Sequence, residues 1–307
     1  YLSRHYVKGM SASVLDDNDV IKMVKETMPD HRAVLLAQDG FYNAWLTYLF
    51  PYHNILSMNI PQMPRMPADY KNFLDMGGRN PLRLWQMSSV ELLLGPVQAW
   101  SQIQNMPDLK DSVELVYAYT MVPSENMSMK IVPGTQQQPG NQVVLRLKNS
   151  IPRFMLVAGW EVADDGVALA KLVSDKNPVG NRLLVAPEFA GELPGISGEG
   201  RVGSVQRLQY RSGYVKLKVS TEQAAILRFA ERYDPDWKAT VDGKPAKVLR
   251  VDYLCQGVVV QPGLHEVVLR YAPANWSFVF QIAGLGLCAG SGLSLILKRR
   301  RSGASHE

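Results

Sequence analysis

Two groups of residues combine aromatic rings with polar side chains, the chemistry that recognises sugars. They are Trp237, Asp242, Tyr253 and His265 in the second half of the chain, and Asp39, Tyr42, Asn43 and Trp85 in the first. Aromatic rings stack on the apolar faces of pyranose rings, while carboxylate and imidazole groups hydrogen-bond to hydroxyls. A structural interpretation competes, because a Trp that starts a strand is often a core anchor and an Asp before Gly is often a turn residue. Both groups are therefore candidate glycan-binding residues.

Other patterns with chemical potential lack the spacing that catalysis needs. Segment 198–203 (GEGRVG) has the form of a dinucleotide fingerprint, but a strand rather than a helix is expected after it. The five histidines have no metal-ligand spacing, and no nucleophile elbow surrounds any Ser. Asp164 and Asp165 precede a Gly and are interpreted as solvated turn carboxylates. We predict no catalytic residue, no metal site and no cofactor.

The elements that must position these residues change in character along the chain. Up to about residue 104, helical and extended patterns alternate, which predicts a mixed α/β layer. The expected elements are a helix at 20–28 capped by Asp19, a strand at 33–37, a helix at 41–49, an extended segment at 55–60 and a helix at 68–76.

From residue 113 onward the hydrophobic period is mostly two, which predicts a mainly β region. The expected strands are 113–120, 141–148, 154–162, 182–186, 202–210, 214–220 and 225–231. Clusters of Gly, Pro and Asn at 133–141 and 187–200 are interpreted as loops.

Segment 233–273 is predicted to form a three-strand meander. Asp242-Gly243 supplies the positive φ of a tight hairpin between strands 237–241 and 247–253. Pro262-Gly263 makes the second turn, after which Val267 and Leu269 share a face with His265 and Tyr271.

This segment closely resembles the C-terminal region of the YfhO-type bacterial membrane proteins. The resemblance rests on an ordered set of residues, followed directly by an apolar run: Tyr233, Pro235, Trp237, Lys238, Val241, Asp242-Gly243-Lys244, Gly257-Val258, Pro262-Gly263, His265 and Tyr271. Weaker similarity extends upstream through Ile151-Pro152-Arg153 and segment 80–94. Asp236 departs from the pattern, since the family usually has Gly between Pro and Trp.

The resemblance implies the architecture of polyprenyl-phosphate-dependent glycosyltransferases of the GT-C class. In such a protein the membrane spans carry the chemistry, with an acidic residue of an early extracytoplasmic loop acting as base. Those positions are not in this chain. The resemblance therefore implies a non-catalytic cap near the active-site mouth, whose partners are upstream transmembrane helices, the lipid bilayer and a lipid-linked sugar or envelope glycan.

Residues 276–297 form an uncharged run of 22 residues, which at 1.5 Å per residue can cross a hydrocarbon layer of about 30 Å. Lys298 and the three arginines that follow it end the run and are expected to stay in the cytoplasm. Gly286, Gly290 and Ser294 form a small-residue stripe that suits packing against other helices. We predict a transmembrane helix, with the bulk of the chain outside the bacterial cytoplasmic membrane.

The predicted fold class is α+β. Its parts are a mixed α/β extracytoplasmic region (1–110), a mainly antiparallel β-sandwich domain (111–275), a transmembrane helix (276–297) and a cytoplasmic basic tail (298–307). The net charge of +5 falls to +2 without the four basic residues at 298–301 and Glu307, so no nucleic acid partner is expected. Cys255 and Cys288 lie on opposite sides of the predicted boundary and are poor disulfide partners.

Three functional hypotheses follow. The first is an acceptor-binding cap of a membrane glycosyltransferase-like protein, of which this chain would be a fragment because it lacks an initiator Met and a signal sequence. The second is a structural or assembly domain of a non-enzymatic membrane protein. The third is a carbohydrate-active β-sandwich with a simple anchor, which the small-residue stripe disfavours.

Overall fold

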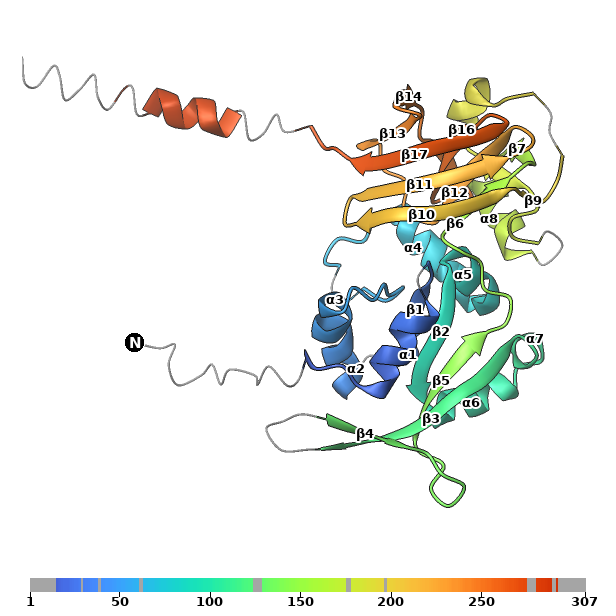
Figure 1. Cartoon of the computed structure of the whole chain (residues 1–307), viewed down its shortest axis with the longest axis vertical. Coiled ribbons are helices and arrows are strands. Elements are labelled where there is room, and N and C mark those ends of the chain that lie inside the picture. The colour runs from blue at the N-terminus through green and yellow to red at the C-terminus, as the bar shows by residue number, and fades with distance from the viewer. Residues whose placement is uncertain are drawn as a thin grey trace, which may run out of the picture.

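The computed structural model describes residues 15–28, 30–37, 40–60, 63–123, 129–174, 178–195, 198–274, 280–288 and 291. Three sheets organise these residues into an N-terminal unit, built on one sheet, and a C-terminal unit, built on two (Figure 1).

The sheet of the N-terminal unit has five strands in the order β1-β2-β5-β3-β4. The pair β1–β2 is parallel and the other three pairs are antiparallel. The strands are β1 (Arg32–Leu35), β2 (Val90–Pro96), β3 (Val113–Pro123), β4 (Met129–Pro133) and β5 (Gln142–Leu147). Because β5 pairs with β2, and β3 and β4 follow β5 in the same sheet, the change to a two-residue period near residue 111 occurs within this sheet.

Helices bury apolar side chains on both faces of this sheet. Leu92 and Leu94 point to the core under α1 to α3, whereas Val90 and Leu93 point to the core under α5 to α7. The helices are α1 (Asp19–Thr27), α2 (Gly40–Ala44), the π-helix η2 (Trp45–Leu49), α3 (Phe50–Tyr52), α4 (Ala68–Asp75), the 3-10 helix η3 (Met76–Gly78), α5 (Pro81–Met87), α6 (Val97–Gln104) and α7 (Pro107–Lys110).

The start of α1 corrects one prediction. The N-cap is Asn18, whose side-chain oxygen accepts a hydrogen bond from the Ile21 amide at 3.0 Å. Asp19 is instead the first helical residue, where its carboxylate faces the positive end of the helix dipole.

The C-terminal unit pairs a seven-stranded sheet with a five-stranded sheet. Their orders are β7-β8-β15-β16-β12-β6-β9 and β10-β11-β17-β13-β14. The strands are β6 (Phe154–Val157), β7 (Trp160–Val162), β8 (Leu183–Val185), β9 (Arg201–Val202), β10 (Ser204–Arg211), β11 (Tyr214–Thr221), β12 (Ala225–Phe229), β13 (Trp237–Val241), β14 (Lys244–Ala246), β15 (Leu249–Val251), β16 (Cys255–Val260) and β17 (Gly263–Tyr271). The strands are mostly antiparallel, as predicted for this half.

The two sheets share one core, to which Leu227 and Val258 contribute from the larger sheet and Leu217 and Val267 from the smaller. The other face of the larger sheet is covered by α8 (Asp165–Val173), the 3-10 helix η5 (Pro187–Glu192) and side chains of α4 and α5. The result is a sandwich with an additional helical layer.

The three-strand meander is a wrong prediction. The Asp242-Gly243 turn does connect β13 to β14, with φ of 50° and 76° at its two residues. The chain then leaves this sheet, because β15 pairs with β16 and β8 in the larger sheet. The turn at Pro262 carries the chain back, and β17 pairs with β13 on one side and β11 on the other.

The two units meet at a charged seam. Arg32 of β1 donates to both carboxylate oxygens of Glu231, at 2.8 and 2.9 Å, and the fully buried Arg153 donates to Glu231 at 3.2 Å. The Arg153 guanidinium also lies over the Tyr210 ring, 4.6 Å from its centroid. Arginine from both units therefore converges on one carboxylate.

The predicted span at 276–297 falls partly outside the described residues, as do Gly290 and Ser294. Residues 280–288, including Gly286, form a helix drawn in orange in Figure 1, on which Phe280, Leu285 and Leu287 are each more than 70% exposed. Across the described ranges, no helix combines the length and the apolar character needed to cross a bilayer.

Candidate functional site

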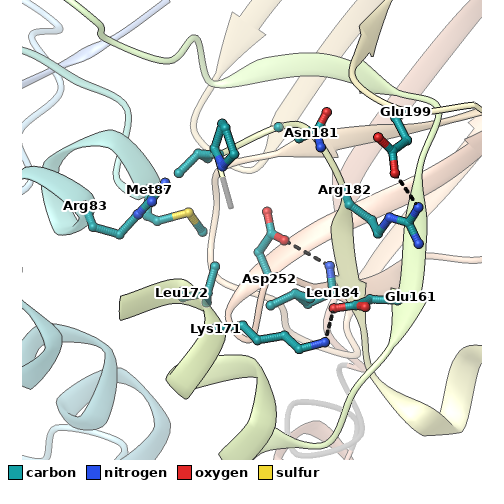
Figure 2. A pocket seen from close by; sticks show the side chains of 13 residues that line it. Arg83, Met87, Glu161, Lys171, Leu172, Asn181, Arg182, Leu184, Glu199 and Asp252 are labelled. Carbon is teal, nitrogen blue, oxygen red and sulfur yellow. Dashed lines mark hydrogen bonds and ion pairs between the residues drawn. The ribbon is translucent and has the colours of Figure 1, made fainter. Parts of the chain in front are cut away.

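A polar pocket of about 270 Å³ opens beside β7 and β8 of the C-terminal unit (Figure 2). Three cations and three carboxylates line it together with an amide and several apolar side chains. The lining residues are Arg83, Met87, Glu161, Lys171, Leu172, Pro178, Val179, Gly180, Asn181, Arg182, Leu184, Glu199 and Asp252. A concave site with several converging polar groups is the usual form of a small-ligand site.

The floor of the pocket is held by a buried ion pair. Asp252 is 2% exposed, and its two carboxylate oxygens accept from the Leu184 amide at 3.1 Å and from Arg228 Nε at 2.7 Å. Arg228 is fully buried and also donates to the Met87 carbonyl at 3.0 Å. This network fixes the Asp252 carboxylate at the base of the pocket.

Cys255 lies against the same guanidinium, with its sulfur 3.1 Å from Arg228 Nη2. Burial raises the pKa of the Cys255 thiol to about 11, and the nearby arginine only partly offsets this effect. The thiol is therefore protonated near neutral pH and has a structural role, since the thiolate is the nucleophilic form.

The rim of the pocket carries two ion pairs that are more exposed than the Arg228–Asp252 pair. Lys171 Nζ lies 2.5 Å from Glu161 Oε1, and Arg182 Nη2 lies 2.6 Å from Glu199 Oε1. All four side chains are between 31% and 61% exposed. Such pairs contribute about 0–1 kcal/mol each, so ligand hydroxyls can replace them at little cost.

Local sequence explains how the rim is positioned. The Asp164 side chain accepts from the Val167 amide at 2.9 Å and caps α8, which presents Lys171 to the pocket. Asp165 instead forms an ion pair with Arg250 at 2.7 Å. The interpretation of this Asp pair as turn carboxylates is thus replaced by a helix start. Gly180 has φ of 83°, and an added Cβ would lie 2.8 Å from Arg201 Nε, so this loop position requires Gly.

The side chains of the pocket offer both donors and acceptors of hydrogen bonds. Arg, Lys and Asn donate hydrogen bonds while Glu and Asp accept them, a mixture that matches a ligand rich in hydroxyls. Within the described ranges, no group of three His, Cys, Asp or Glu residues could hold a metal ion.

The first predicted group does not converge on this pocket. Trp237 is half-buried and packs edge-on against Phe229, with ring centroids 5.9 Å apart. Asp242 accepts from His265 Nδ1 at 2.7 Å and from the Glu266 amide at 2.8 Å, which ties the β13–β14 turn to β17. Tyr253 is buried in the core on the other face of the larger sheet.

The second predicted group is also divided. Tyr42 is buried and donates to Gln142 Oε1 at 2.7 Å, whereas Asn43 is exposed. Trp85 is buried in the core on the opposite face of the N-terminal sheet. Asp39 lies outside the described residues.

Sequence reasoning did not identify the residues of the pocket. A usable signal was present, because Arg228 interrupts the apolar strand segment AILRFA and Asp252 stands between the apolar residues Val251 and Tyr253. A charge in a buried strand needs a partner, and two such charges predict a pair. The rim residues carry no comparable signal.

Comparison with known proteins identifies one family. The model of the family described as bacterial membrane protein YfhO matches residues 201–282, which confirms the predicted resemblance over this stretch. The match contains Arg228 and Asp252 and extends into the uncharged run that starts at residue 276. Neither the curated proteins nor the solved structures gave a significant match.

Proposed function

We propose that this chain is the extracytoplasmic, glycan-binding part of a membrane-associated glycosyltransferase-like protein, and that the pocket over Asp252 receives the sugar. The observation that carries the proposal is the pocket itself, where donors and acceptors face one cavity (Figure 2). The ligand is a sugar unit of an envelope glycan or of a lipid-linked saccharide.

Recognition uses both the buried Asp252 at the base of the pocket and the ion pairs on its rim. Asp252 is already oriented by Arg228 and Leu184, so it can accept from a sugar hydroxyl without reorganisation. On the rim, hydroxyls exchange with the Lys171–Glu161 and Arg182–Glu199 contacts, and each released group gains a new partner. The chain binds and orients the sugar, and transfer depends on the upstream membrane helices.

Membrane attachment through residues 276–297 is part of the proposal. It is supported by the family match, by the lack of charge in this run and by the exposed apolar residues Phe280, Leu285 and Leu287. The basic residues from Lys298 onward would then lie in the cytoplasm, with Gly286, Gly290 and Ser294 against the upstream helices.

The structural or assembly hypothesis keeps one argument in its favour. Each carboxylate of the pocket has a partner within the protein, as expected of side chains that only stabilise the fold.

A binding measurement distinguishes the glycan-binding proposal from the structural hypothesis. The full chain in detergent micelles is titrated with envelope oligosaccharides up to millimolar concentration and observed by NMR or calorimetry. We expect weak binding that Arg182→Ala combined with Glu161→Ala reduces about thirtyfold, the equivalent of losing two hydrogen bonds of about 1 kcal/mol each. The matched control is Lys218→Ala combined with Glu222→Ala, two exposed residues in and just after β11 of the smaller sheet.

No binding by the folded chain, or equal loss in both double variants, would favour the structural role. Sugar transfer by the chain alone would contradict the proposal that this chain only binds the sugar and that the upstream membrane helices catalyse the transfer.

A further inference from the structure

The outer face of the five-stranded sheet ends in a row of basic and aromatic side chains. Arg211 pairs with Tyr214, Tyr214 with Arg270, and Arg270 with Lys238, across β10, β11, β17 and β13. Directly paired residues of antiparallel strands point to the same face of a sheet. These four residues are called the strand-end row.

The row places three cations together. Arg211, Lys238 and Arg270 are exposed, and the Arg211 guanidinium lies over the Tyr214 ring, 4.9 Å from its centroid. Among the described residues none of these three cations forms an ion pair, and Lys238 donates only to the Pro235 carbonyl, at 2.9 Å. Asp234 and Asp236 act on Tyr271, one position further along β17, and raise the pKa of its phenol.

The same face is different beyond the row. On β11, Lys216 and Lys218 follow Tyr214 on this face; Lys216 is paired with Glu266 at 2.8 Å, and Lys218 lies opposite Glu266 of β17. Glu266 therefore accompanies both lysines, whereas the strand-end row itself contains no carboxylate.

The position of the row limits what it can face. Five residue steps separate Tyr271 from the start of the apolar run at Trp276, and an extended chain spans at most about 18 Å over that length. The polar headgroup layer of a bilayer extends several ångströms beyond its ~30 Å hydrocarbon core. The row thus lies close to the headgroups when the run at 276–297 is inserted.

We infer that the strand-end row is a membrane contact that seats the five-stranded sheet on the phospholipid headgroup layer. Guanidinium and ammonium groups bind lipid phosphates, while Tyr214, whose ring lies under the Arg211 guanidinium, has the amphipathic character typical of the interface. This inference rests on the membrane attachment in the proposed function. It adds a second contact that fixes how the folded units stand on the bilayer.

The test uses the full chain, with Cys288→Ser, in vesicles of equal parts phosphatidylcholine and phosphatidylglycerol. A fluorophore is attached at Ser212→Cys, in the turn at the row, or at Ser204→Cys, at the opposite end of the same strand β10. Lipids with a nitroxide headgroup quench a nearby fluorophore. We expect clearly stronger quenching at position 212 than at 204.

Charge reversal provides the second arm. Arg211→Glu, Lys238→Glu and Arg270→Glu together should remove the difference, since each cation near an anionic surface changes the contact equilibrium about fivefold. The matched control reverses Lys218, Lys244 and Lys247, which are exposed away from the row. Thermal melts of both triple variants check that the fold is kept.

Carbonate extraction distinguishes the two proposals. If the chain is extracted from the vesicles, membrane attachment fails and this inference falls with it. If the chain stays inserted but positions 212 and 204 are quenched equally, or if the row variant is quenched like its control, the headgroup contact alone is overturned.

Discussion

At the scale of single residues, the Arg228–Asp252 ion pair holds the base of the pocket in place. Both side chains are buried, and their contact of 2.7 Å is backed by hydrogen bonds to Met87 and Leu184. A buried pair adds little net stability, but removal of one member leaves an uncompensated charge in the core.

We therefore predict that Asp252→Ala destabilises the protein by about 3–5 kcal/mol, because the Arg228 guanidinium loses its counter-ion. Lys171→Ala on the rim should cost less than about 1 kcal/mol. Chemical denaturation of both variants measures the difference. Similar midpoints for the two would mean that Asp252 is not the buried anchor described here.

A second residue-scale prediction concerns Asp242 and His265. Their hydrogen bond raises the pKa of His265 above its ordinary value of 6.5 and lowers the pKa of Asp242 below its ordinary value of 3.8. The His265 contribution is full below 6.5 and is lost as pH rises through the raised pKa, while the Asp242 contribution is lost as pH falls through the lowered pKa.

The pair thus stabilises the β13–β14 turn most between about pH 4 and 6.5. Melting temperatures measured within and on both sides of this range should be highest within it. His265→Gln should reduce this pH dependence. A variant that keeps the same pH profile would show that the pair contributes nothing measurable, as is common for exposed contacts.

At the scale of elements, the Asp242-Gly243 turn was predictable because its chemistry is local. Both residues have positive φ, the geometry that Asp-Gly favours in a two-residue hairpin. The partner of the next strand was not predictable. A two-residue period predicts a strand within residues 247–253, but it does not say which of two sheets that strand joins.

Helix α8 was missed for a related reason. Asp164, Asp165 and Gly166 have turn chemistry, but the same Asp that favours a turn also caps a helix when an apolar run such as 167–173 follows it. The pocket rim depends on this helix, so an error in one element hid part of the candidate site.

We predict that Gly243→Val strains the turn by about 1–3 kcal/mol, because a β-branched residue does not tolerate its φ of 76°. Gly191→Val, where no positive φ and no close neighbour occur, is the matched control. A thermal melt compares them. An unchanged melting temperature for Gly243→Val would contradict the two-residue turn.

At the scale of the whole molecule, attachment through residues 276–297 predicts a defined sidedness. A cysteine at Lys244, in the exposed β13–β14 turn, should react with an impermeant thiol reagent in intact cells. A cysteine at Arg300 should react only after permeabilisation, because clustered basic residues resist translocation. Cys288→Ser removes background, and the reverse labelling pattern would overturn the orientation.

The position of β17 also sets the order in which the protein can fold during synthesis. This last strand lies in the middle of the five-stranded sheet, between the hairpins β10–β11 and β13–β14, and pairs with β11 on one side and β13 on the other. A ribosome must therefore complete residues 263–271 before the sandwich can close. Until then, the edges of β11 and β13 that pair with β17 lack their hydrogen-bonded partner.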